Sequence, residues 1–76
     1  MKHIVQYHIS QGEDGYYVAS GIDVPVVTQG KTLDELAHNI QEATELLFED
    51  ESPENFGFAG HPSVMINFEL PTLVHA

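Results

Sequence analysis

Apolar and polar residues alternate along several short stretches of the chain, as they do in β-strands with one buried face. The clearest alternation places Val64, Ile66 and Phe68 on one side, with Met65 and Asn67 on the other. The other stretches are rich in β-branched and aromatic residues, which favour strands. The predicted strands span residues 2–9, 16–20, 26–29 and 64–70.

A helix is predicted from residue 32 onward. Thr32 and Glu35 have the spacing of a capping box, in which the threonine hydroxyl accepts from the Glu35 backbone N–H and the glutamate reaches back. Residues at three- and four-residue spacing then form one stripe that we expect to face a core. They are Leu33, Leu36, Ala37, Ile40, Ala43, Thr44, Leu47 and Phe48. Carboxylates at 49–51 oppose the helix dipole, so we expect the helix to fray there, before Pro53.

These elements predict a single domain over residues 1–76, of the α+β class with the order β-β-β-α-β. We expect a small, mostly antiparallel sheet with one helix packed on one face. Residues 52–62 are predicted to form a loop whose Phe56 and Phe58 close the open end of the core. Residues 72–76 are predicted to be a tail that offers an extra edge strand.

One helix covers only one face of a sheet, so the other face meets water or a partner. The alternation in the first and last strands predicts which residues lie on that open face. They are Ile4, Gln6, His8, Met65, Asn67 and Glu69, a half-apolar mixture that suits either environment.

The charge balance excludes several classes of partner. Twelve acidic residues oppose only Lys2 and Lys31, which gives a formal net charge of −10 without any arginine. Nucleic-acid binders displace counterions with Lys and Arg, so we expect no direct binding to nucleic acid or to an anionic membrane surface. A basic protein is the natural complement, because opposite charge speeds encounter.

Length and cysteine content point to self-association in a cytoplasmic setting. A chain of 76 residues buries only roughly 60% of its unfolded surface, and it has no cysteine for a disulfide. We therefore expect a homodimer or a higher homo-oligomer. No run of about 18 apolar residues exists, and residues 1–8 lack the apolar middle of a signal peptide. Cytoplasmic localisation is the expectation.

The sequence predicts neither a metal nor a cofactor. The five histidines (His3, His8, His38, His61 and His75) show no chelating spacing, although folding brings distant residues together and leaves a weak zinc site open. So small a core leaves little volume for a small-molecule pocket.

An unpaired acidic row on the helix is the strongest candidate site. Glu42, Glu45 and Glu49 recur at three- and four-residue spacing, and Asp50 follows. Two interpretations stay open: a solvated face, or a surface for a basic partner. The predicted partner-binding residues are Asp23, Pro25, Glu42, Glu45, Glu49 and Asp50.

Three motifs in order resemble the N-terminal domain of the HicB antitoxin family. They are DGYYVAS at 14–20, DVP at 23–25 and TQGKTLDEL at 28–36, and the likeness covers residues 1–50 well and the last strand loosely. The resemblance implies a degraded ribonuclease-H-like fold with strand order 3-2-1-4. It also implies an antitoxin function in a toxin–antitoxin system, namely neutralising a small basic HicA-type toxin that cleaves messenger RNA.

The chain departs from that family in two places. Family members often carry a C-terminal DNA-binding domain, which we do not expect within these 76 residues, and the turn at Pro25-Val26-Val27 is shorter than the family's usual turn. A stand-alone homo-oligomeric domain with no toxin partner is therefore the alternative. An active ribonuclease-H-like enzyme needs a carboxylate on the first strand, and residues 2–9 contain none, so we expect no enzymatic activity.

Overall fold

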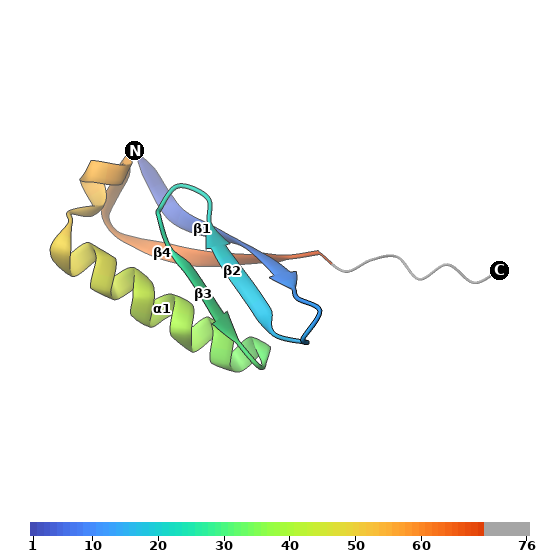
Figure 1. The fold of residues 1–76 in the computed structure, drawn as a ribbon. Coiled ribbons are helices and arrows are strands. Elements are labelled where there is room, and N and C mark those ends of the chain that lie inside the picture. The colour runs from blue at the N-terminus through green and yellow to red at the C-terminus, as the bar shows by residue number, and fades with distance from the viewer. Residues whose placement is uncertain (70–76) are drawn as a thin grey trace.

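The computed structural model describes residues 1–69 as a four-stranded sheet with one long helix (Figure 1). The elements in chain order are β1 (Lys2–Gln11), β2 (Tyr17–Gly21), β3 (Val27–Gly30), α1 (Leu33–Asp50), the 3₁₀ helix η1 (Pro53–Phe56) and β4 (Phe58–Phe68). The predicted α+β class and the β-β-β-α-β order are confirmed. Leu70 and the predicted tail strand at 72–76 lie outside the described residues.

The sheet has the order β3-β2-β1-β4. β1 pairs antiparallel with β2 and parallel with β4, and β2 pairs antiparallel with β3. This is the strand order that the family resemblance implied. β1 is central, and both β3 and β4 are edge strands.

The hairpin between β1 and β2 forms where the Asp14-Gly15 pair predicts it. Gly15 has a φ of 86°, a conformation that costs glycine little. The Asp14 carboxylate accepts a hydrogen bond from the Tyr16 backbone N–H at 3.1 Å. The aspartate therefore stabilises the turn that begins β2.

The start of helix α1 follows the predicted cap. The Thr32 hydroxyl accepts from the Glu35 N–H at 3.0 Å, and the Glu35 carboxylate accepts from the N–H of Lys31 at 3.2 Å. The returning bond thus reaches the residue before the cap. The helix ends at Asp50, where the Glu51 N–H donates to the Leu47 carbonyl at 2.9 Å.

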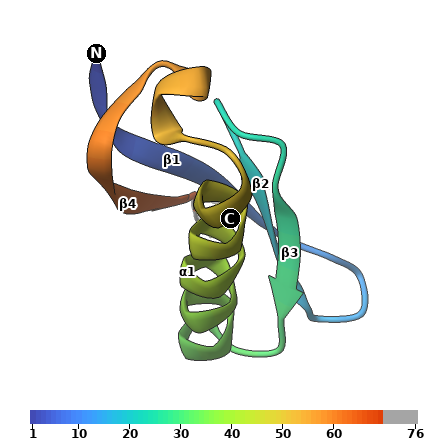
Figure 2. The same cartoon turned by 90° about the vertical axis from the view of Figure 1, so that its left-hand side faces the viewer.

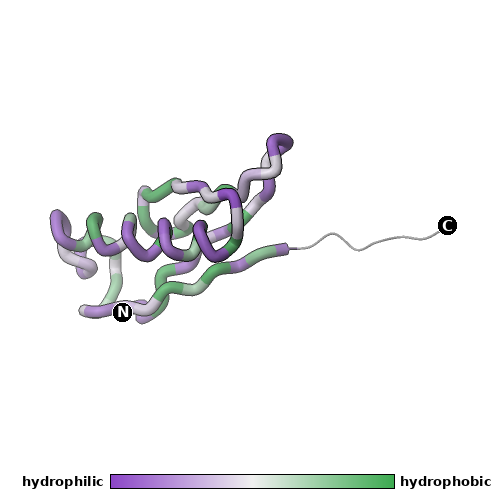
Figure 3. The backbone as a smooth tube through the Cα atoms, turned by 90° about the horizontal axis from the view of Figure 1, so that it is seen from below, coloured by the Kyte–Doolittle hydropathy of each residue, from purple (hydrophilic) through white to green (hydrophobic). Residues whose placement is uncertain are grey.

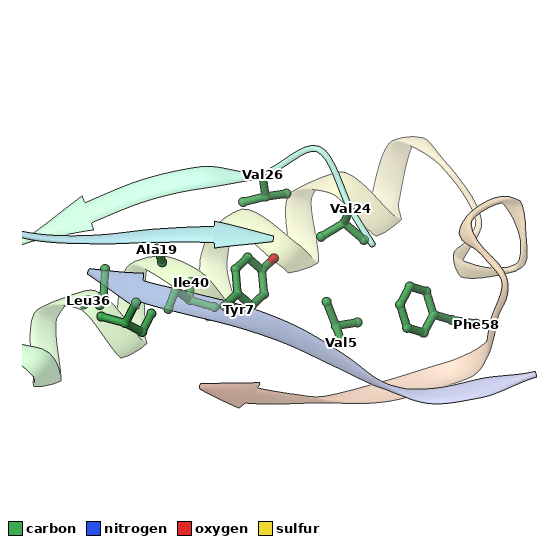
Figure 4. Packing of buried hydrophobic residues seen from close by; sticks show 9 residues of the cluster. Val5, Tyr7, Ala19, Val24, Val26, Leu36, Ile40 and Phe58 are labelled. Carbon is green, nitrogen blue, oxygen red and sulfur yellow. The ribbon is translucent and has the colours of Figure 1, made fainter. Parts of the chain in front are cut away.

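The core lies between α1 and the helix-facing side of the sheet (Figure 4). Its buried members are Val5, Tyr7, Ile9, Ala19, Val24, Val26, Leu36, Ile40 and Phe58. Phe58 closes one end of the core together with the half-buried Phe48 and Phe56, as predicted for the two loop aromatics. Leu33 was expected in the apolar stripe, but it is 46% exposed in the first helical turn, so that prediction is wrong.

Strand β4 begins six residues earlier than the predicted strand, because part of the expected 52–62 loop belongs to it. Lys2 lies opposite Phe58 whereas Ile4 lies opposite Ser63, so β4 bulges between these pairs. The bulge contains His61, which has a φ of 57°, and Pro62, which has no N–H to donate. An edge strand tolerates both features, and among residues 1–69 no strand pairs with the outer side of β4.

Helix α1 crosses the sheet toward one margin. It packs against β2 and β3 and leaves β4 largely uncovered (Figures 1 and 2). Ile66 faces the same side as Val64 and Phe68, but it is 39% exposed because the helix does not extend over it. This offset leaves a gap between α1 and β4.

The opposite side of the sheet, here called the open sheet face, carries no helix. Register and alternation place on it Ile4, Gln6, His8, Ser10, Val18, Ser20, Val27, Gln29, Ser63, Met65 and Asn67. Five of the six residues predicted for this face are therefore confirmed. The sixth, Glu69, lies just beyond the end of β4.

Candidate functional site

The strongest charged feature is a row of carboxylates on the second half of α1. Glu42, Glu45, Glu49 and Asp50 are all exposed, and we call them the acidic helix face. In Figure 3 hydrophilic positions recur along the length of the helix, interrupted by the apolar residues that face the core. Like charges three or four residues apart on a helix repel each other, so this arrangement costs stability.

The two lysines of the chain contact residues outside the acidic helix face. The Lys2 ammonium forms an ion pair with Asp23 at 3.1 Å, and the Lys31 ammonium lies 5.9 Å from the centre of the Tyr16 ring. Among residues 1–69, neither lysine forms an ion pair with the acidic helix face. In that part of the chain, the exposed His38 gives the nearest basic contact, with Nε2 3.6 Å from a Glu42 carboxylate oxygen. Within residues 1–69 the acidic helix face therefore has no Lys or Arg counter-charge.

A groove runs beside this face, in the gap between α1 and β4. It has a volume of about 810 Å³ and is open to solvent. We call it the α1–β4 groove. Its lining residues are Gln41, Thr44, Glu45, Phe48, Glu49, Pro53, His61, Pro62, Ser63 and Val64.

The groove combines apolar and anionic character. Phe48, Val64 and Pro62 supply apolar surface, whereas Glu45 and Glu49 bring two carboxylates from the helix. Near the groove, Glu54 accepts a hydrogen bond from Ser52. That bond, with a smaller contribution from the charge of His61, lowers the pKa of the Glu54 carboxyl group and favours its anionic form. Such a groove suits a protein segment that carries Lys or Arg beside an apolar side chain.

The predicted partner-binding residues do not all come together. Glu45 and Glu49 line the groove, whereas Glu42 and Asp50 lie on the same helix outside its lining. Asp23 and Pro25 belong to the connection between β2 and β3, and the carboxylate of Asp23 is paired with Lys2. The carboxylates that line the groove therefore all come from the helix.

Sequence reasoning missed the residues that β4 and η1 contribute to the groove. They are Pro53, His61, Pro62 and Val64, which lie at least eight positions from Glu45 in the sequence and meet it only through the fold. One sequence signal pointed to this segment. Two prolines, Pro53 and Pro62, follow the acidic helix and interrupt regular secondary structure there.

Two further findings bear on the chemistry of the site. Within residues 1–69, no group of three or more His, Cys, Asp or Glu side chains is placed to hold a metal ion. The same part of the chain contains no helix that is both long enough and apolar enough to cross a membrane.

Comparison with known proteins adds no relative from which a role can be transferred. No family model, curated protein or solved structure matches the chain. Support for a function therefore comes from the chain's own charge distribution, exposed residues and groove.

Proposed function

We propose that this domain binds a basic protein through its acidic helix face and the α1–β4 groove. In this proposal it is a HicB-like antitoxin that neutralises a small basic, mRNA-cleaving toxin of the HicA type. The observation that carries the proposal is the row of exposed carboxylates which, within residues 1–69, has no Lys or Arg counter-charge. The strand order β3-β2-β1-β4 supports it as well, since the family resemblance implies that order.

The carboxylates of the acidic helix face lower the stability of the isolated chain, but they attract a basic partner. Repulsion between these carboxylates disfavours the isolated helix, and a partner bearing Lys or Arg relieves that repulsion on binding. A protein that cleaves RNA needs a basic surface to hold the phosphate backbone. The acidic helix face complements such a surface and competes with RNA for it. Neutralisation then follows from occlusion in a stoichiometric complex, with no catalytic step.

The α1–β4 groove adds an apolar contact surface to the electrostatic attraction of the acidic helix face. Rim charges chiefly raise the association rate, whereas a buried apolar anchor slows dissociation. Phe48 and Val64 offer that anchor surface beside Glu45 and Glu49. A partner segment with one apolar side chain between two basic ones fits this arrangement.

A stand-alone homo-oligomer with no toxin is the second candidate. The open sheet face favours it, because that face carries no carboxylate and so suits another copy of the chain better than a basic protein. The two candidates differ in one respect that an experiment detects: only the first requires a basic partner that is toxic by itself.

The test is a growth experiment with the gene next to the one for this chain, which we expect to encode a small basic protein. That protein alone is expected to arrest growth and degrade mRNA, and co-expression of this chain is expected to restore growth. A variant with Glu45→Gln and Glu49→Gln is expected to restore it poorly. The matched control, Glu13→Gln with Glu69→Gln, removes the same charge from exposed positions outside the groove and is expected to protect fully. Absence of a toxic basic neighbour, or equal protection by both variants, would contradict the proposal.

A further inference from the structure

The acidic residues of this chain are absent from its sheet. None of the 12 Asp and Glu residues lies within β1, β2, β3 or β4; they occupy the helices, the turns and the segments between elements. On the open sheet face, the side chains are aliphatic groups, hydroxyls and amides, with His8 as the one titratable group. A chain with a net charge of −10 thus has one broad surface without carboxylates.

That face also exposes apolar side chains on both of its margins. Val27 on β3 is 72% exposed, Met65 on β4 is 44% exposed, and Ile4 on β1 is 39% exposed. Among the polar groups, the Asn67 amide donates to the Gln6 side-chain oxygen at 3.2 Å. Because these two amides already satisfy part of each other's hydrogen bonding, burying them costs less than burying unpaired amides.

We propose that the open sheet face is a homodimer interface in which two copies pack sheet against sheet. Two copies of a chain this acidic repel each other at nearly every other surface, because carboxylates would meet carboxylates. A basic partner gains no ion pair on the open sheet face and is drawn to α1 instead. A second copy offers the matching uncharged surface, and sheets stack face to face at about 10 Å with their side chains interdigitated.

The edges of the sheet fit such pairing less well. On β4 the bulge at His61 and the missing N–H of Pro62 interrupt the outer row of hydrogen-bonding groups. β3 has only four residues, and the Asn39 side chain on α1 donates to the Gln29 carbonyl at 2.8 Å. Strand addition at either edge therefore meets a short or interrupted template, which favours the face.

This interface is independent of the proposed antitoxin function. Helix α1 and the open sheet face lie on opposite sides of the sheet, so a basic partner and a second copy do not compete for the same surface (Figure 2). Loss of one interaction is therefore expected to leave the other intact. A dimer without a toxin partner remains compatible with this inference.

The test is the mass of the purified full chain in solution, measured by light scattering after size exclusion. The chain mass is 8.4 kDa, and wild type is expected to show twice that value at about 0.15 M salt. Ile4→Glu and Met65→Glu each place a carboxylate on the interface and are expected to give the monomer mass. Leu33→Glu is the matched control, because it adds the same charge at an exposed apolar residue of the helix and is expected to remain dimeric.

Val27→Glu keeps the test decisive if the other variants fold poorly. Val27 is 72% exposed in the single chain, so a carboxylate there is compatible with the folded monomer, as circular dichroism would verify. It too is expected to give the monomer mass. A wild-type chain that is monomeric under these conditions would overturn the inference. So would folded face variants that all remain dimeric, since they would assign the interface to another surface.

Discussion

The Tyr7 hydroxyl group lies 2.6 Å from the Thr44 hydroxyl oxygen and joins the central strand to the middle of the helix. Thr44 in turn donates to the Ile40 carbonyl at 2.7 Å, so its oxygen accepts the hydrogen bond from Tyr7. Both residues are buried. Since no buried side-chain polar atom within residues 1–69 lacks a partner, this pair gives the apolar core a satisfied polar link.

That link predicts a loss of stability at alkaline pH. Burial raises the pKa of the Tyr7 phenol above its ordinary value of 10.0. The folded state therefore holds this proton more tightly than the unfolded state does. The resulting stability is fully present below about pH 10 and is lost as the pH rises through the folded-state pKa.

Tyr7→Phe separates this effect from other alkaline titrations. At neutral pH the variant is expected to be about 1 kcal/mol less stable, because one buried hydrogen bond is lost. Its unfolding free energy should then fall less than that of wild type at alkaline pH. Urea unfolding at several pH values measures both. If the unfolding free energies of wild type and Tyr7→Phe fell equally with rising pH, Tyr7 would not control the loss of stability at alkaline pH.

The contact between Gly30 and α1 predicts a second effect on stability. A Cβ atom at Gly30 would lie 2.7 Å from the backbone nitrogen of Leu36 and 2.9 Å from its Cα, and neither atom is at the flexible end of a side chain. Gly30→Ala is therefore expected to push the helix away from β3 and to cost about 1–3 kcal/mol in urea unfolding. Gly60→Ala is the control, because its Cβ would meet only a Glu54 side-chain oxygen at 3.8 Å. Equal stability of the two variants would contradict the close packing of helix on strand.

Local sequence signals predicted much of the fold. Thr32 and Glu35 predicted the helix start because a capping box depends on residues three positions apart. The extent of β4 could not be predicted in this way. His61 and Pro62 interrupt the alternation, and their tolerance in a strand depends on β4 being at the edge of the sheet.

For the candidate site, the sequence predicted the carboxylates on the helix but not the groove beside them. Glu45 and Glu49 stand out by their helical spacing and by the shortage of Lys and Arg. The groove beside them depends on where α1 crosses the sheet, a long-range relationship that also leaves Ile66 exposed. The ion pair between Lys2 and Asp23, which removes Asp23 from the free carboxylates, likewise joins residues distant in the sequence.

If the carboxylates of the acidic helix face serve binding and not folding, removing their charge should raise the unfolding free energy of the isolated chain. Glu45→Gln with Glu49→Gln removes repulsion along the helix, and Glu49 also lies near the negative end of the helix dipole. The gain in unfolding free energy is expected to be about 0.3 kcal/mol per relieved pair at low salt, and smaller at high salt. Thermal unfolding at two ionic strengths measures it. A destabilised double variant would indicate that these carboxylates support the fold.

The central claim is that a basic protein binds at the acidic helix face, and co-purification tests it most directly. The tagged chain would be co-expressed with its neighbouring gene, which we expect to encode a small basic protein. The purified material would be washed at about 0.15 M salt and weighed by mass spectrometry. Wild type and the Glu13→Gln, Glu69→Gln control are expected to retain the basic protein in a fixed ratio, and the Glu45→Gln, Glu49→Gln variant is expected to lose most of it. Recovery of this chain alone, or equal retention by all three forms, would contradict the account.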